Sequence, residues 1–323
     1  MLDGFLDQFW PATVDGLSLG AIYALVALGY TMVYGVLRLI NFAHSEVFMV
    51  GTVAALFTLT TIGVSGQLGG LALIGMLLLI AVVAVVASVV TAVGLEYIAY
   101  RPLRKRGGSR LAALISAIGA SLFLQQLFAL IVIPGLFQLP QQGGRLPVQA
   151  PGWVRRSDVI TIGDFVVRND KLLVLVAAVL MMVALDQFVN RTNLGRGIRA
   201  TAQSPENAVL MGVNIDRIIT ATFAIGGAMA GVAGALYLMR FEETNYFVGF
   251  LLGIKAFTAA VLGGIGNLRG ALVGGLVLGL IEMYGSAFFG SEWQHVVAFV
   301  VLVLVLMFRP TGILGESLQQ ARA

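Results

Sequence analysis

Long apolar runs recur along nearly the whole chain and are separated by short polar breaks. A helix needs about 20 mainly apolar residues to cross the hydrocarbon core of a bilayer. The candidate spans are 14–37, 42–62, 71–98, 112–133, 172–189, 218–239, 250–265, 271–289 and 295–308. The runs 250–265 and 295–308 are short, so one of them is expected to be re-entrant or broken. We predict an all-α, polytopic transmembrane helical bundle of about nine spans, within a range of eight to ten.

The composition agrees with the bilayer as the main solvent of this chain. Hydrophobic residues make up 59% of its 323 residues, and charged residues make up 11%. A soluble domain carries about 25% charged residues. The basic residues lie in the polar breaks rather than along one stripe, so no nucleic-acid partner is predicted. Cysteine is absent and only two histidines occur, so no disulfide framework and no metal site are predicted.

Charge asymmetry between the loops predicts the orientation in the membrane. The segment 101–110 holds five basic residues and no acid, and the segment 190–217 holds four arginines. Lys and Arg are enriched in cytoplasmic loops, so both segments are expected there. With nine spans the N-terminus then lies outside and the C-terminus in the cytoplasm. The Pro- and Gly-rich loop 134–171 is expected outside, without a soluble domain in it.

Glycines four residues apart occur on several apolar segments. Three pairs are Gly227 with Gly231, Gly270 with Gly274, and Gly275 with Gly279. In lipid, small residues at this spacing let helix backbones approach closely. These pairs predict helix packing rather than chemistry.

A short helix is predicted inside the cytoplasmic loop 190–217. Ser204 can cap a helix, Pro205 suits its first position, and Glu206 favours its first turn. Gly212 is then a natural stop, so the helix covers about 205–211. The order of Glu206, Asn207 and Ala208, then three further residues and Gly212, resembles the EAA loop of ABC-importer permeases, although Asn207 departs from the usual Ala. In that family such a helix docks into the ATPase subunit. The predicted coupling residues are Ser204, Pro205, Glu206, Asn207, Ala208 and Gly212.

Four further segments resemble branched-chain amino-acid ABC transporter permeases of the LivH type. They are 16–51, 101–125, 254–282 and 309–315, and they occur in family order over nearly the whole chain outside the loop 134–171. One departure is Ser45, where the family usually has Gly between His and Glu. The resemblance implies that residues 1–323 form a single transmembrane permease domain.

The same resemblance implies the activity and the partners. Such a subunit translocates leucine, isoleucine and valine inward across a bacterial-type inner membrane. Its partners are a second related permease, two ATPases, an external solute-binding protein, the small polar solute and membrane lipid. The three lysines are Lys105, Lys171 and Lys255, and none follows a glycine, so the chain lacks a Walker A motif. ATP and Mg would therefore be bound by the partner ATPases, and no cofactor or catalytic residue is expected here.

Ionisable groups at membrane depth are functional candidates because they are costly to bury. Glu46 and Lys255 could match the two charges of an amino-acid zwitterion, and the Gly-interrupted run 250–266 could form a pathway wall. Structural alternatives are that Lys255 snorkels to the headgroups and that Glu46 pairs with His44 or Arg38. The pathway candidates are Asn41, His44, Glu46, Lys255, Gly263, Gly264 and Glu282.

Three alternative functions compete with this prediction. Another solute stays open, whereas a secondary transporter or channel and a membrane-embedded enzyme are disfavoured. Related permeases carry urea, short-chain amides or other amino acids, and no residue excludes these solutes. A secondary transporter or channel should lack an ATPase-docking loop and often has paired acids in mid-span. A membrane-embedded enzyme needs a catalytic pair, and none occurs at a convincing spacing.

Overall fold

The computed structural model describes residues 2–64, 66–162, 165–309 and 311–315. Among them, eight helices are long and apolar enough to cross a membrane: Gln8–Leu37, His44–Ile62, Gly70–Lys105, Leu111–Phe137, Asn169–Arg191, Ile215–Phe241, Leu268–Phe289 and Ser291–Phe308. A ninth apolar helix, α11 (Val248–Gly263), has 16 residues. It rises about 24 Å, less than the hydrocarbon thickness of about 30 Å. The predicted bundle is confirmed, and α11 is its short member.

The other helices are α1 (Leu2–Leu37), α2 (His44–Ile62), α3 (Gly70–Leu95), α4 (Arg101–Lys105), α5 (Arg110–Leu127), α6 (Ile133–Phe137), α7 (Asn169–Arg191), α8 (Asn193–Gln203), α9 (Pro205–Leu210), α10 (Ile215–Phe241), α12 (Leu268–Phe289) and α13 (Gln294–Phe308). The long helices follow the predicted runs, although their ends differ by several residues, and three short helices, α4, α6 and α8, were not predicted. Two π-helical turns, η1 (Glu96–Tyr100) and η2 (Phe128–Val132), join α3 to α4 and α5 to α6. Two 3₁₀ turns are η3 (Gln141–Arg145) and η4 (Ser291–Trp293).

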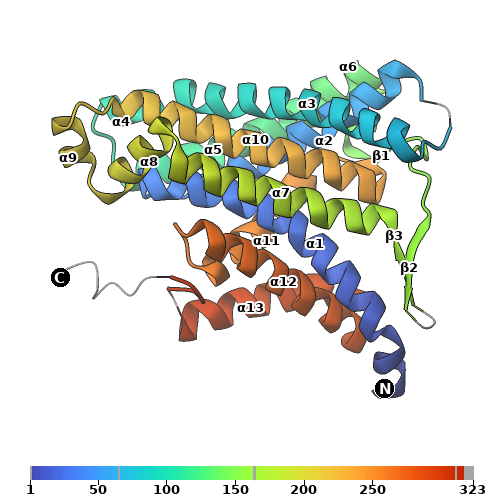
Figure 1. The fold of residues 1–323 in the computed structure, drawn as a ribbon. Helices are drawn as coiled ribbons and strands as arrows, with labels where there is room; N and C mark the ends of the chain where they lie inside the picture. Colours follow the sequence, from blue (N-terminus) through green and yellow to red (C-terminus); the bar gives the residue numbers. More distant parts are fainter. Residues whose placement is uncertain (1, 65, 163–164, 310, 316–323) are drawn as a thin grey trace.

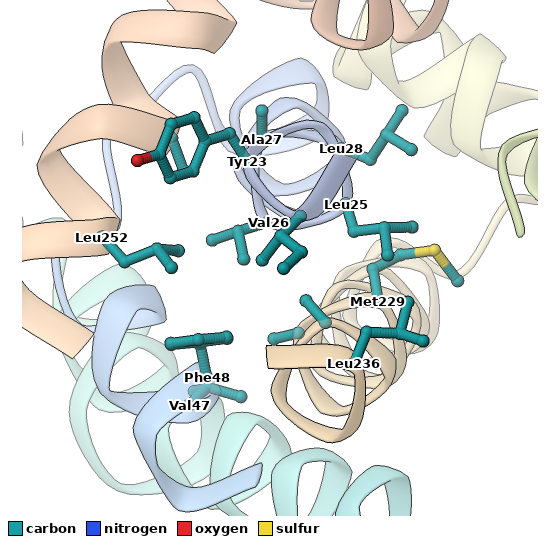
Figure 2. Packing of buried hydrophobic residues seen from close by; sticks show 14 of the residues in the cluster. Tyr23, Leu25, Val26, Ala27, Leu28, Val47, Phe48, Met229, Leu236 and Leu252 are labelled. Atoms are coloured by element: carbon teal, nitrogen blue, oxygen red, sulfur yellow. The ribbon is translucent and has the colours of Figure 1, made fainter. Parts of the chain in front are cut away.

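Helix α1 lies at the centre of the bundle and α13 at its edge. In the most apolar 18-residue stretch of each span, 94% of the residues are buried in α1, against 6% in the span that contains α13. Figure 2 shows Leu25 and Val26 of α1 beside side chains of α2, α10 and α11, while Leu28 points to another side of α1. The central helix is therefore the one that other helices cover, and the exposed apolar faces belong to the outer helices.

Glycine lets helices of this bundle approach backbone to backbone. A Cβ atom built on Gly20 of α1 would lie 2.6 Å from the carbonyl oxygen of Gly275 in α12. Gly279 of α12 likewise contacts Gly16 of α1, so these four glycines form an antiparallel seam between α1 and α12. Gly231 of α10 contacts the backbone of α3. These contacts confirm that the spaced glycines serve packing.

The loop 134–171 contains strands that the sequence analysis did not predict. Strand β1 (Val148–Gln149) pairs antiparallel with β4 (Glu243–Thr244), and β2 (Asp158–Ile162) pairs antiparallel with β3 (Phe165–Arg168). A parallel bridge joins Leu68 to Val154. The strands are too short to give a strong alternating pattern, and β4 lies far along the chain from β1. The fold is therefore nearly all-α, with small sheets at one end.

The polar segments gather at two opposite ends of the bundle. Figure 1 shows α4, α8 and α9 together at one end and β1, β2 and β3 at the other. The two basic loops thus lie on the same side, opposite the loop 134–171, as their charges predicted. The start of α1 and the end of α13 lie at opposite ends of the bundle.

Candidate functional site

The segment between α7 and α10 folds into the short helix that its sequence predicted. The Ser204 hydroxyl oxygen accepts a hydrogen bond from the backbone N–H of Asn207 at 3.3 Å, which caps α9. Pro205 and Glu206 occupy its first turn. Gly212 has a φ of +81°, the left-handed conformation that ends a helix and that glycine adopts without strain.

Helix α9 presents large apolar side chains at an end of the molecule that is otherwise polar. Leu210 is 84% exposed and Met211 85% exposed, while Ala208 on the same turn is buried. Exposed apolar patches of this kind mark interaction sites. Val209, Leu210 and Met211 were not among the predicted coupling residues, although they form an apolar triplet within a polar loop.

Helix α8 fixes this segment to the bundle. The Thr192 hydroxyl caps α8 by accepting from the N–H of Gly195 at 3.0 Å. Arg199 of α8 donates to the carbonyl oxygen of Val189 in α7. Arg38, which follows α1, donates to the carbonyl oxygen of Ala202 at 2.8 Å. The apolar tip of α9 is therefore carried on a support that contacts both α7 and the end of α1.

Lys255 and Glu282 are brought together as a buried ion pair between α11 and α12. The lysine is 6% exposed and the glutamate 0%, and the ammonium contacts Glu282 Oε1. Tyr23 of α1 donates to the same oxygen at 3.2 Å, and Gln294 of α13 donates to it at 2.7 Å. Lys255 therefore does not snorkel to the membrane surface, and the pairing compensates both charges.

Glu46 is buried at the start of α2 without a cationic partner among the described residues. Its Oε1 atom accepts from Ser45 at 3.2 Å, from Ser121 at 3.0 Å and from Gln125 at 2.9 Å. Its Oε2 atom has no hydrogen-bond partner in the described part of the chain. The pairing with His44 or Arg38 that the sequence left open is not formed. Glu46 is thus a buried carboxyl group with one oxygen available.

Three of the remaining pathway candidates lie in packed contacts. The side-chain oxygen of Asn41 accepts from the Tyr100 hydroxyl at 2.7 Å. Gly263 accepts from the N–H of Leu314 at 3.1 Å, and its Cα faces the backbone of Gly270. Gly264, with a φ of +105°, contacts the segment that follows α13. The glycines thus join the end of α11 to residues 311–315, which follow α13.

His44 lies close to Glu46 but faces another side of α2. Its ring packs edge-on against Tyr30, with centroids 5.0 Å apart, and it fits where Gly29 and Gly226 leave room. Asn41, His44 and Glu46 therefore cluster near the start of α2, whereas Lys255 and Glu282 form a second site and the two glycines a third.

Comparison with known proteins decides the family. The protein-family model described as "Branched-chain amino acid transport system / permease component" matches residues 12–306. The chain belongs to this family. The permease is 43% identical to the high-affinity branched-chain amino acid transport system permease protein BraD of Pseudomonas aeruginosa over 303 residues, 94% of each chain. It is 40% identical to LivH of Escherichia coli over 318 residues, 97% of this chain and 96% of LivH.

A more distant archaeal relative extends the comparison. A probable branched-chain amino acid transport permease protein LivH of Methanocaldococcus jannaschii is 28% identical to this permease over 305 residues, 91% of this chain and 89% of the relative. The family and the apolar helices together identify the permease as a multi-pass inner-membrane protein and a subunit of an importer.

Proposed function

We propose that this permease carries leucine, isoleucine and valine inward across a bacterial-type inner membrane. Its near-full-length identity to BraD and LivH supports this solute class. The assembly would contain a second related permease, two ATPases that hold ATP and Mg, and an external solute-binding protein. Residues 1–323 would form one transmembrane permease domain without catalysis of its own. The α9 end would lie in the cytoplasm, with the N-terminus outside and the C-terminus inside.

The apolar tip of α9 is the observation that carries the coupling role. A helix outside the bilayer with Leu210 and Met211 almost fully exposed offers a docking surface for an ATPase. Because α8 joins this tip to α7 and to the end of α1, ATPase motion would reach the bundle through a rigid support. The coupling residues Ser204, Pro205, Glu206, Asn207, Ala208 and Gly212 would set the position of the tip.

Polar substitution of the tip tests this docking. The double variant Leu210→Asp/Met211→Asp should insert normally but retain little ATPase on purification. An apolar anchor of an interface is worth about 2 kcal/mol or more, so the co-purified ATPase should fall at least about tenfold. Leu146→Asp is the matched control, because Leu146 is also exposed but lies two residues before β1, at the opposite end of the bundle. Wild-type ATPase recovery in the double variant would remove the docking role.

The position of the tip should matter as much as its polarity. Gly212→Val places a β-branched residue at a φ of +81°, and Ala208→Glu places a charge at a buried position. Both variants should keep normal membrane insertion but show weakened ATPase assembly or ATP hydrolysis without uptake. Expression, co-purified ATPase and uptake are measured in the same preparation. If both variants assemble and transport as the wild type does, the segment is a connector only.

We assign the solute pathway to the contact between α2 and α11. Short or interrupted helices build substrate sites near the membrane midplane of transporters, and α11, with 16 residues, is shorter than the hydrocarbon thickness. Gly249 and Gly253 of α11 face Ser45, and the available oxygen of Glu46 points toward Gly249. Glu46 would receive the ammonium group of the zwitterion, with Asn41 and His44 beside it and Gly263 and Gly264 at the far end of α11.

Removing this charge distinguishes amino acids from urea and short-chain amides. Glu46→Gln should lower leucine uptake and leucine-stimulated ATP hydrolysis in proteoliposomes, because the amide cannot match an ammonium group. Glu243→Gln removes the same charge from strand β4 outside the long helices and serves as the control. Equal leucine uptake by Glu46→Gln and wild type would refute this assignment. Preferred uptake of urea or an amide by the wild type would replace the proposed solute.

A further inference from the structure

A hollow on the outer surface of the bundle lies between η1–α4 and the first turns of α10. Its volume is about 470 Å³, and it is at the same end as α8 and α9. Tyr97 and Arg101 line it on one side, and Arg217, Ala221 and Ala224 on the other. Nothing in the coupling or pathway proposals uses this hollow.

The mouth of the hollow carries positive charge that its own acids do not compensate. Arg104 donates to Asp216 at 2.6 Å and to the buried Glu96 at 3.2 Å, so both carboxylates already have a cationic partner. Arg101 reaches the same Asp216 only at 3.3 Å, and its Nε atom has no acceptor among the described residues. Arg217 is exposed, and no ion pair or hydrogen bond of its side chain is found in the described part of the chain. In the lining of the hollow itself, Arg101 and Arg217 thus face one acid, Asp216, which Arg104 already holds from outside the lining.

The polarity of the hollow changes along the axis of α10. Arg217 is the third residue of this helix. Ala224 lies seven residues further on and therefore about 10 Å deeper toward the membrane centre. Arg101 packs its guanidinium over the Tyr97 ring at 4.7 Å, an arrangement suited to the level of the headgroups. The hollow is therefore cationic at its mouth and apolar at its depth.

We propose that this hollow binds an anionic phospholipid of the leaflet at the α9 end. Arg101 and Arg217 hold the phosphate, and one acyl chain lies along Ala221 and Ala224. A subunit outside the membrane could contact the arginines but could not reach Ala224, whereas a phospholipid fills both parts. The proposal requires only that the helices span a bilayer, so it does not depend on the identity of the solute.

The test uses the purified full-length chain and native mass spectrometry of bound lipid. Phosphatidylglycerol and phosphatidylcholine with identical acyl chains are compared, and the first should bind more tightly. Arg217→Gln should lower the affinity for phosphatidylglycerol about fivefold, since an arginine near an anionic headgroup is worth about 1 kcal/mol. Arg191→Gln is the matched control, because Arg191 is exposed at the same end but does not line the hollow. The Arg217 side chain makes no hydrogen bond or ion pair in the described part of the chain, so Arg217→Gln should fold normally.

One further variant and one competing ligand distinguish a lipid from other occupants of the hollow. Ala224→Trp fills the apolar depth and leaves the arginines in place, so it should lower phosphatidylglycerol binding. Glycerol 1-phosphate, which has no acyl chain, should compete poorly. Equal binding of both lipids, an equal loss in Arg191→Gln, or strong competition by glycerol 1-phosphate would overturn the proposal. Unchanged lipid binding in Arg217→Gln, together with reduced co-purification of the second permease from cells that express both subunits, would assign the hollow to a protein contact instead.

Discussion

At the scale of single residues, the Lys255–Glu282 pair shows how this permease tolerates charge at membrane depth. Glu282 Oε1 accepts hydrogen bonds from the Lys255 ammonium, the Tyr23 hydroxyl and the Gln294 amide, so side chains of four helices meet at one oxygen atom. A buried ion pair contributes little net stability, because desolvation of the two charges offsets their attraction. Loss of one partner, by contrast, leaves an uncompensated buried charge. The pair therefore acts as a constraint on how α1, α11, α12 and α13 fit together.

Single and double substitutions of this pair should differ in how much stability they cost. Lys255→Met or Glu282→Gln alone should destabilise the folded chain by about 3–5 kcal/mol, while Lys255→Met/Glu282→Leu should recover most of that loss. Thermal unfolding of the purified chain, together with leucine uptake, measures both consequences. Recovery of stability and of uptake in the double variant assigns the charges to structure. Recovered stability without uptake would instead place them in the solute pathway.

The sequence located the buried charges but not their partners. Apolar surroundings were enough to place Glu46, Lys255 and Glu282 at membrane depth. Lys255 and Glu282, however, lie on successive helices, and their meeting depends on the register of the α11–α12 hairpin. Ser121 and Gln125 reach Glu46 from α5, far along the chain, so no local pattern links them. Pairing of side chains between helices is a property of packing, which hydropathy does not encode.

At the scale of elements, the seam between α1 and α12 depends on the absence of side chains. Gly16 and Gly20 of α1 meet Gly275 and Gly279 of α12, so the two backbones touch directly. In lipid the hydrophobic effect does not drive helices together, and close packing has to supply the attraction. A seam of this kind cannot absorb a methyl group, because the obstacle is backbone rather than a flexible side chain.

Gly20→Val should separate α1 from α12. Its Cβ would lie 2.6 Å from the Gly275 carbonyl oxygen and 2.9 Å from the Leu276 Cα atom. Overpacking costs about 1–3 kcal/mol or more, so the yield of folded permease should fall. Gly75→Val in α3 is the control, since nothing lies within 4 Å of a Cβ there. Size-exclusion profiles and thermal unfolding compare the two variants. Equal profiles for both would show that α1 and α12 can move apart without loss.

Elements with strong local signals were predictable, whereas those defined by distant partners were not. Hydropathy located the spans, and the Ser204–Pro205 start with the Gly212 stop located α9. The helix α1 begins at Leu2 rather than at 14, because a helix continues through backbone hydrogen bonds after the apolar density falls. The turns η1 and η2 and the pairing of β1 with β4 left no local pattern to read.

At the scale of the whole molecule, the placement of polar segments makes the proposed orientation directly testable. The chain has no native cysteine, so one introduced thiol reports on one position. Gln203→Cys in α8 and Gly152→Cys between β1 and β2 are exposed and lie at opposite ends. A membrane-impermeant thiol reagent added to intact cells should label the second and not the first. Labelling of Gln203→Cys alone would invert the proposed topology.

The seam between α1 and α12 also has a consequence for the order of events during biosynthesis. The central helix α1 leaves the ribosome long before α12, yet α12 is the helix that covers its glycine face. At the usual pace of translation, about 5–20 residues per second, α1 waits on the order of tens of seconds for this partner. During that interval its glycine backbone faces lipid or an insertion factor. Chains truncated before α12 would keep this face open, which gives cellular quality control a feature by which to recognise incomplete permease.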